Sequence, residues 1–127
     1  HRSWAQNNEK TPVAVVLGAD PATLLSAALP LPETVSELTF SGAINGKRPR
    51  MVQAKTVPLM VPAEAEIVLE GWVSPTDTAP EGPFGDHLGY YSLTHDFPAV
   101  NVDTVYHHSR AVVWSVVRAT GFESTVR

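Results

Sequence analysis

Two carboxylic acids within one turn form the most chemically capable segment of the chain, the run Glu-Gly-Pro-Phe-Gly-Asp-His-Leu-Gly-Tyr-Tyr from Glu81 to Tyr91. Its glycines permit backbone angles closed to other residues, and its proline fixes one φ, so the run predicts a shaped loop. Glu81 and Asp86 could divide acid–base work, because one carboxyl can stay ionised while its neighbour keeps a proton to donate. The same residues could also form a surface turn whose acids are only solvated.

Length and composition limit what such a site could serve. A chain of 127 residues is enough for one domain with its own core. The net charge of −4 lacks the basic excess of nucleic-acid-binding domains. Cysteine is absent, which excludes disulfides and thiolate metal sites, and no apolar run approaches the roughly 18 residues of a membrane span. We therefore expect a cytoplasmic domain that has no nucleic-acid partner.

Two short helices near the N-terminus and several strands must position this loop. The first helix is expected over residues 22–28, with Asp20 as its N-cap and Pro21 at its first position. The second is expected to begin at Glu33 or Thr34 and to end at Gly46. Strands are expected over residues 12–18, 49–56, 65–73, 100–107 and 111–117, with a long loop over residues 74–89. This arrangement predicts an α+β domain built on a small barrel.

Several blocks of the sequence resemble one enzyme family. The run from Glu81 to Tyr91 is similar to the Glu-Gly-Pro-Phe-Gly-Asp/Glu-His-x-Gly-Tyr signature of the UbiD-type decarboxylases, which use prenylated flavin mononucleotide (prenylated FMN). Four further segments, all N-terminal to this run, also resemble the family and occur in the family's order. They are Pro-Val-Ala-Val-Val-Leu-Gly at 12–18, Asp-Pro at 20–21, Pro-Leu-Pro and Val-Ser-Glu within 30–37, and Val-Pro-Ala-Glu-Ala-Glu-Ile-Val-Leu-Glu-Gly at 61–71. The resemblance extends over residues 10–107.

The resemblance implies that residues 1–127 form a single domain equivalent to the middle, split-barrel (flavin-reductase-like) domain of a longer, homo-oligomeric enzyme. The intact enzyme would remove carbon dioxide from an aromatic or α,β-unsaturated carboxylic acid, with prenylated FMN taking up the electrons left behind. This portion alone is expected to be inactive. Two other classes stay open: a stand-alone split-barrel module that binds ordinary flavin for electron transfer, and a non-catalytic assembly domain. Neither of them needs both acids of the loop.

The resemblance also implies separate roles for the two acids. Asp86 matches the acid that delivers a proton to the substrate carbon after carbon dioxide leaves. That role needs a carboxyl group that is protonated near neutral pH, which desolvation by Phe84 and Tyr90 would favour. Glu81 matches the glutamate that pairs with an arginine and helps to mature the cofactor. The matching arginine would lie in a segment outside this chain.

Metal sites are implied at two further places. Glu37 matches a ligand of Mn²⁺ or Mg²⁺ that bridges to the cofactor phosphate, and such ions take only one or two protein carboxylates. From the residues alone, Glu37 could equally lie on a solvated helix face. The backbone carbonyls of Ser26 and Leu29 match a site for a monovalent cation such as K⁺. Pro30 prevents the helix from continuing and leaves such carbonyls available, although water could satisfy them instead.

Two segments depart from the family pattern. Relatives commonly carry lysine where this chain has Gln53, and residues 118–127 do not match the Gly-Arg/Lys-Pro-Pro segment expected there. The sequence also does not identify the carboxylic acid substrate, because the resemblance places part of the substrate-facing wall in segments outside this chain.

Overall fold

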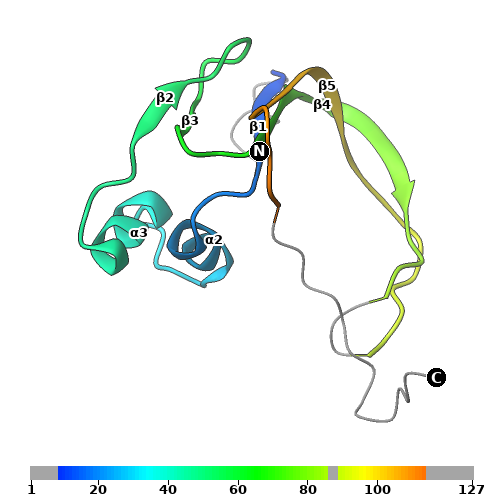
Figure 1. The fold of residues 1–127 in the computed structure, drawn as a ribbon. Helices are drawn as coiled ribbons and strands as arrows, with labels where there is room; N and C mark the ends of the chain where they lie inside the picture. The colour runs from blue at the N-terminus through cyan, green and yellow to red at the C-terminus, as the bar shows by residue number, and fades with distance from the viewer. Residues whose placement is uncertain (1–8, 86–88, 114–127) are drawn as a thin grey trace, which may run out of the picture. The chain divides into compact units, whose positions relative to one another are not determined.

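The computed structural model describes residues 9–85 and 89–113. They fall into two compact units: a core unit of residues 12–72 and 101–113, and a loop unit made by the described parts of residues 9–11 and 73–100. In chain order the elements are β1 (Thr11–Leu17), α2 (Pro21–Ala28), α3 (Glu37–Asn45), β2 (Met51–Gln53), β3 (Met60–Pro62), β4 (Ile67–Glu81) and β5 (His95–His107) (Figure 1).

The expected α+β content is confirmed, but the expected barrel is not. The strands form a three-stranded sheet in the order β1-β4-β5 and a separate two-stranded sheet of β2 and β3. Within residues 9–85 and 89–113, these two sheets do not close into a barrel. No described helix is long and apolar enough to cross a membrane.

Helix α2 begins and ends as the sequence predicts. The carboxylate of Asp20 accepts hydrogen bonds from the backbone N–H groups of Ala22 at 3.0 Å and Thr23 at 3.3 Å, and Pro21 occupies the first turn. These contacts satisfy amide groups that a helix start leaves without partners. At the other end, Leu29 is the C-cap in an extended conformation, directly before Pro30.

Helix α3 begins later than expected, at Glu37 rather than at Glu33 or Thr34. The backbone N–H of Val35 bonds to the carbonyl of Pro32 at 2.9 Å, which closes a turn ahead of the helix and leaves Ser36 as its N-cap. The predicted end is confirmed, since Gly46 is the C-cap with φ of 66°, a left-handed conformation that favours glycine. Figure 1 shows α3 beside α2 within the core unit.

The small hairpin of β2 and β3 replaces the single longer strand that was expected over residues 49–56. The two strands are antiparallel, with Val52 opposite Val61. The chain turns after Gln53, where the N–H of Ala54 bonds to the carbonyl of Leu59 at 2.9 Å. Strand β3 was not predicted, because three residues ending in proline carry too short a pattern to mark a strand.

Strands β4 and β5 are both longer than predicted, and residues 74–81 belong to β4 rather than to a loop. From Thr76 to Glu81 every residue is exposed, so no apolar alternation signals the strand there. The strand expected over residues 111–117 is absent at 111–113, and the rest of it lies outside the described residues. A turn does occur at Ser109 and Arg110, as predicted.

The hydrophobic core lies in the core unit, between the β2–β3 hairpin and the first part of β4. Its buried residues are Ala54, Val57, Val61 and Val68. Partly buried side chains pack around them from β1, β4 and β5, including Val16, Trp72 and Tyr106. This packing holds the turn of the hairpin against β4.

Candidate functional site

The loop that carries the predicted acids starts where β4 ends, at Glu81. Gly82 follows with φ of 101°, and a Cβ atom built on it would lie 2.8 Å from the carbonyl oxygen of Leu93. Both the backbone angle and this close approach require glycine. The carboxylate of Glu81 is exposed and makes no hydrogen bond or ion pair with any residue that the structure describes. It is therefore available to a partner from elsewhere.

Ser92 closes the loop from its far side. Its backbone N–H donates to the carbonyl of Phe84 at 2.9 Å, and its hydroxyl accepts from the N–H of Phe84 at 3.1 Å. A single antiparallel bridge between Gly85 and Tyr91 continues this closure. The predicted shaped loop is therefore held at Phe84 and Gly85, directly before the predicted acid.

The predicted proton donor, Asp86, lies outside the described residues. The two rings expected to desolvate it are described, and both are exposed: Phe84 is 48% exposed and Tyr90 is 75% exposed. Neither ring is therefore buried by the described part of the chain. An apolar enclosure for this loop would have to come from another part of the protein or from a bound ligand.

The predicted metal ligand Glu37 is the first residue of α3 and is exposed. A carboxylate in the first turn of a helix interacts favourably with the positive end of the helix dipole, which supplies a structural reason for the residue. No group of three or more His, Asp or Glu residues that could hold a metal ion occurs among residues 9–85 and 89–113. A metal site that included Glu37 would therefore take its other ligands from outside these described residues.

Ser26 and Leu29, the predicted monovalent-cation site, lie in the last turn and cap of α2. The side chain of Ser26 is completely buried, and its hydroxyl donates to the carbonyl of Ala22 at 2.6 Å. The carbonyl of Leu29 already accepts from the N–H of Leu31 at 2.9 Å. One acceptor position of Leu29 is therefore in use, and the small buried serine also serves the packing of α2.

Glu70, the one completely buried carboxylate among the described residues, was not predicted as a site residue. Its Oε1 accepts from the backbone N–H of Lys55 at 2.7 Å and from the hydroxyl of Tyr106 at 2.6 Å. Its Oε2 accepts from the backbone N–H of Thr56 at 2.5 Å and from the Thr56 hydroxyl at 2.6 Å. Four donors from two distant segments thus converge on one side chain. The only available signal was an acid on the Val68 and Trp72 side of an apolar strand.

The environment of Glu70 keeps it ionised. Desolvation by burial raises the pKa of Glu70, but the hydrogen bonds from Thr56, Tyr106 and the backbone amides outweigh it and hold the pKa at about 2. Desolvation, followed by the hydrogen bond to Glu70, raises the pKa of Tyr106 to about 12. The ammonium group of Lys55 lies 4.1 Å from the centre of the Tyr106 ring, close enough for a cation–π interaction. This cluster joins the hairpin turn to β4 and β5.

Comparison with known proteins decides the family. Residues 1–120 match the family described as "UbiD: 3-octaprenyl-4-hydroxybenzoate carboxy-lyase Rift-related domain". The chain belongs to the UbiD family. The resemblance that the sequence blocks indicated is therefore confirmed.

Solved structures of UbiD-class enzymes have the same fold. The enzyme HmfF from Pelotomaculum thermopropionicum, solved in complex with FMN, is 32% identical with a TM-score of 0.83, over 88% of this chain and 25% of that one. An evolved dimeric form of HmfF, solved with prFMN, gives the same identity and TM-score over 88% and 26%. The closed form of vanillic acid decarboxylase from Sedimentibacter hydroxybenzoicus is 30% identical with a TM-score of 0.82, over 88% and 24%. The chain spans about a quarter of the length of these UbiD relatives.

Proposed function

We propose that this chain is the middle domain of a decarboxylase that uses prenylated FMN to remove carbon dioxide from an aromatic or α,β-unsaturated carboxylic acid. Membership of the UbiD family supports the decarboxylase class, and relatives solved with FMN and prFMN support a flavin cofactor. The observation that carries the proposal is the loop after β4. It presents the carboxylate of Glu81, which has no partner among the described residues, next to a backbone that Gly82 and Ser92 hold in place.

The loop residues fit a flavin-dependent site. When bound, the flavin would take up the electron pair released as the carbon–carbon bond to the carboxylate breaks. The exposed ring of Phe84 offers an apolar surface beside the acids, and an enclosing ligand or domain would desolvate it. In our proposal Asp86 gives its proton to the carbon that has lost carbon dioxide and regains one before the next turnover. Glu81 stays ionised and pairs with a cation from another part of the enzyme.

The metal assignments follow the same proposal. Glu37 would contribute one carboxylate to Mn²⁺ or Mg²⁺ next to the cofactor phosphate, because its exposed side chain makes no hydrogen bond or ion pair with the described residues. The carbonyls of Ser26 and Leu29 would help to hold K⁺ at the end of α2. In the intact enzyme, which we place in the cytoplasm as a homo-oligomer, the two sheets would form part of a split barrel.

The decisive test is the Asp86→Asn variant of the intact enzyme, reconstituted with prenylated FMN and assayed for carbon dioxide release from a panel of aromatic and unsaturated acids. The amide is nearly isosteric but cannot donate and regain a proton at neutral pH. Loss of a positioned general acid typically lowers the rate by about 10²–10⁴-fold. Cofactor binding, followed by flavin absorbance, is expected to survive in this variant.

Asp96→Asn is the matched control, because Asp96 is an exposed acid of the same type in the same unit. Its turnover is expected to equal that of the wild type. If Asp86→Asn keeps more than about a tenth of the wild-type turnover, the deficit is below ~1.4 kcal/mol and the residue is no essential proton donor. An intact protein that binds flavin but releases no carbon dioxide from any acid would instead favour the electron-transfer module.

A further inference from the structure

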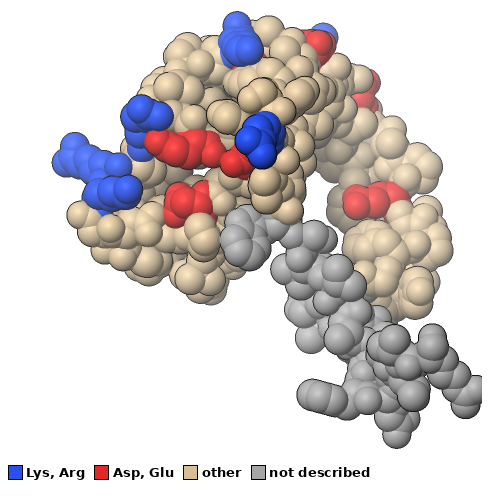
Figure 2. All heavy atoms as spheres, viewed as in Figure 1, with Lys and Arg blue, Asp and Glu red and all other residues tan. Residues whose placement is uncertain are grey.

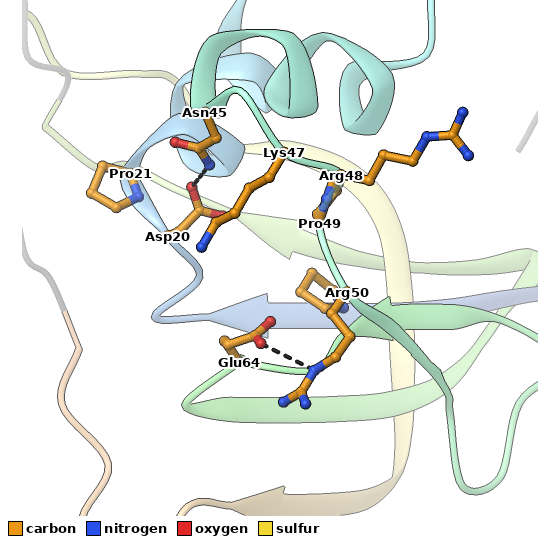
Figure 3. Close-up of a pocket in the computed structure, with 9 residues that line it drawn as sticks. Asp20, Pro21, Asn45, Lys47, Arg48, Pro49, Arg50 and Glu64 are labelled. Atoms are coloured by element: carbon orange, nitrogen blue, oxygen red, sulfur yellow. Dashed lines mark hydrogen bonds and ion pairs between the residues drawn. The ribbon is translucent and has the colours of Figure 1, made fainter.

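A hollow lies in the core unit, near the C-terminal end of α3 and therefore at the opposite end of that helix from Glu37. It has a volume of about 360 Å³ and is bounded by the start of α2, the connection from α3 to β2, and the turn after β3 (Figure 3). Small-molecule sites in proteins typically have volumes of about 300–1,000 Å³, so the hollow is large enough for a compact organic ligand. Neither the Glu81 loop nor the residues proposed for metal binding line it.

Basic side chains dominate the charge of this pocket. Lys47, Arg48 and Arg50 line it, against two carboxylates, Asp20 and Glu64. Figure 2 shows lysine and arginine side chains gathered over the region of α3 and β2, with acidic side chains between them. The three cations outnumber the two carboxylates, so the side chains that line the pocket have a net charge of +1.

Both carboxylates are already engaged. Asp20 caps α2, accepts from the hydroxyl of Thr23, and receives the side-chain amide of Asn45 at 2.8 Å. The hydrogen bond from Thr23 is the main cause of an Asp20 pKa below its usual value, so the group stays ionised and occupied. Glu64 pairs with the Nε of Arg50 at 3.2 Å. This exposed contact leaves the terminal amino groups of the guanidinium without a partner among the described residues.

The remaining cations have no such partner. Within residues 9–85 and 89–113, Lys47 and Arg48 form no hydrogen bond or ion pair through their side chains. Figure 3 shows Lys47 extending over the pocket toward Asp20, while Arg48 extends away from it. Exposed side chains change rotamer within nanoseconds, so Arg48 can swing toward a bound anion.

The backbone that carries these cations is held in place. A Cβ atom on Gly42 would lie 3.3 Å from the carbonyl oxygen of Lys47 and 3.3 Å from the ring of Pro49, so this connection packs closely on α3. Its far end is tied to the turn after β3, because the N–H of Ala63 donates to the carbonyl of Arg50 at 2.8 Å. A held backbone lowers the entropy lost when a ligand binds.

Three proline rings, from Pro21, Pro49 and Pro62, supply apolar wall next to the positive charge. We propose that this pocket binds a small organic anion in which a carboxylate group is attached to an apolar ring. The carboxylate would lie against Lys47 and the swung-in Arg48, and the ring would cover the prolines. Binding here requires neither Glu81 nor a flavin, so it stands independently of the decarboxylase proposal.

The test uses the 127-residue chain, labelled with ¹⁵N and titrated by NMR. Benzoate is the probe, while benzamide keeps the ring without the charge and acetate keeps the charge without the ring. We expect benzoate to shift the amide signals of residues 45–50 and 62–64 saturably, and each comparison compound to bind at least about fivefold more weakly. Raising the salt concentration should weaken benzoate binding, because exposed charges are screened.

A charge-matched pair of variants then assigns the site. Lys47→Gln with Arg48→Gln is expected to weaken benzoate binding by at least about fivefold, the upper range for exposed charge contacts. Lys10→Gln with Arg110→Gln removes the same charge from residues that do not line the pocket, and should leave binding unchanged. Equal binding of benzamide, equal losses in both double variants, or shifts confined to other residues would each overturn the proposal. The benzamide comparison needs no variant, so it holds even if a substitution disturbs folding.

Discussion

Strand β4 carries two glutamates with opposite surroundings. Glu70, in the core unit, is completely buried, and four hydrogen bonds occupy its carboxylate. Glu81, at the end of the same strand in the loop unit, is exposed and has no partner among the described residues. A carboxylate whose acceptor positions are filled contributes to stability and has little capacity left for chemistry. A carboxylate held on a shaped loop without partners is available to a substrate, a cofactor or a cation.

The contrast between Glu70 and Glu81 is tested most strongly by measuring activity, where we expect the largest effect. We expect Glu81→Gln to lower turnover of the intact enzyme by about 10²-fold or more, because removing one member of an enclosed ion pair leaves the other charge uncompensated, at a cost of about 3–5 kcal/mol. The neutral amide cannot pair with the proposed cation, so cofactor maturation should suffer as well. Single-turnover assays with flavin absorbance followed in parallel would show both effects. A fully active Glu81→Gln enzyme would reduce the loop to a polar turn.

For stability we expect the reverse: substitution of Glu70 should have a larger effect than substitution of Glu81. Glu70→Gln removes the charge and turns an amide N–H₂ group toward donors, so we expect the free energy of unfolding to fall by about 2–3 kcal/mol. Glu81→Gln should change it by less than about 0.5 kcal/mol, as is usual for exposed sites. Urea denaturation of both variants measures the difference. Equal losses in the two would show that the Glu70 hydrogen bonds contribute nothing specific.

The unfolding free energy should also depend on acidic pH through Glu70. The pKa of Glu70 is about 2 in the folded chain and near 4.5 in the unfolded chain, so the unfolded state binds the proton first as pH falls. Its stabilising contribution is complete above pH 4.5 and is lost progressively between pH 4.5 and about pH 2. We expect Glu70→Gln to show a flatter fall of unfolding free energy across this interval than the wild type. Denaturation curves at several pH values measure this dependence. Equal slopes of unfolding free energy against pH in the variant and the wild type would contradict the prediction.

A smaller effect is expected from the hydroxyl of Tyr106. Tyr106→Phe removes one of four donors and leaves the other three, so we expect a loss of about 1 kcal/mol in unfolding free energy. The same variant should also lack the contribution of Tyr106 to the loss of stability between pH 10 and about pH 12, since a tyrosine with its pKa raised to about 12 stabilises the fold only while it is protonated. Thermal unfolding at pH 8 and pH 11 checks both statements, with Tyr91→Phe as an exposed control.

Much of the candidate site could be predicted because its signals are local. One glycine with a required positive φ (Gly82), a second glycine, a proline and two acids stand close together between Glu81 and Asp86. The blocks that identify the UbiD family are also contiguous. The start and end of α2 were also predictable, because Asp20 satisfies amide groups only two and three residues away. The start of α3 was missed, since a single backbone hydrogen bond from Val35 to Pro32 decided it.

Only the tertiary structure determined the features that depend on contacts between residues far apart in the chain. Glu70 reads as one acid in a strand until Thr56 and Tyr106, 14 residues before and 36 residues after it, are seen to converge on its oxygens. The outer half of β4 carries no apolar alternation, so backbone pairing rather than a sequence pattern makes it a strand. The basic pocket likewise joins the cap of α2 to the turn after β3. Local backbone and side-chain preferences are written in neighbouring residues, whereas burial and convergence of charge depend on which distant segments the fold brings together.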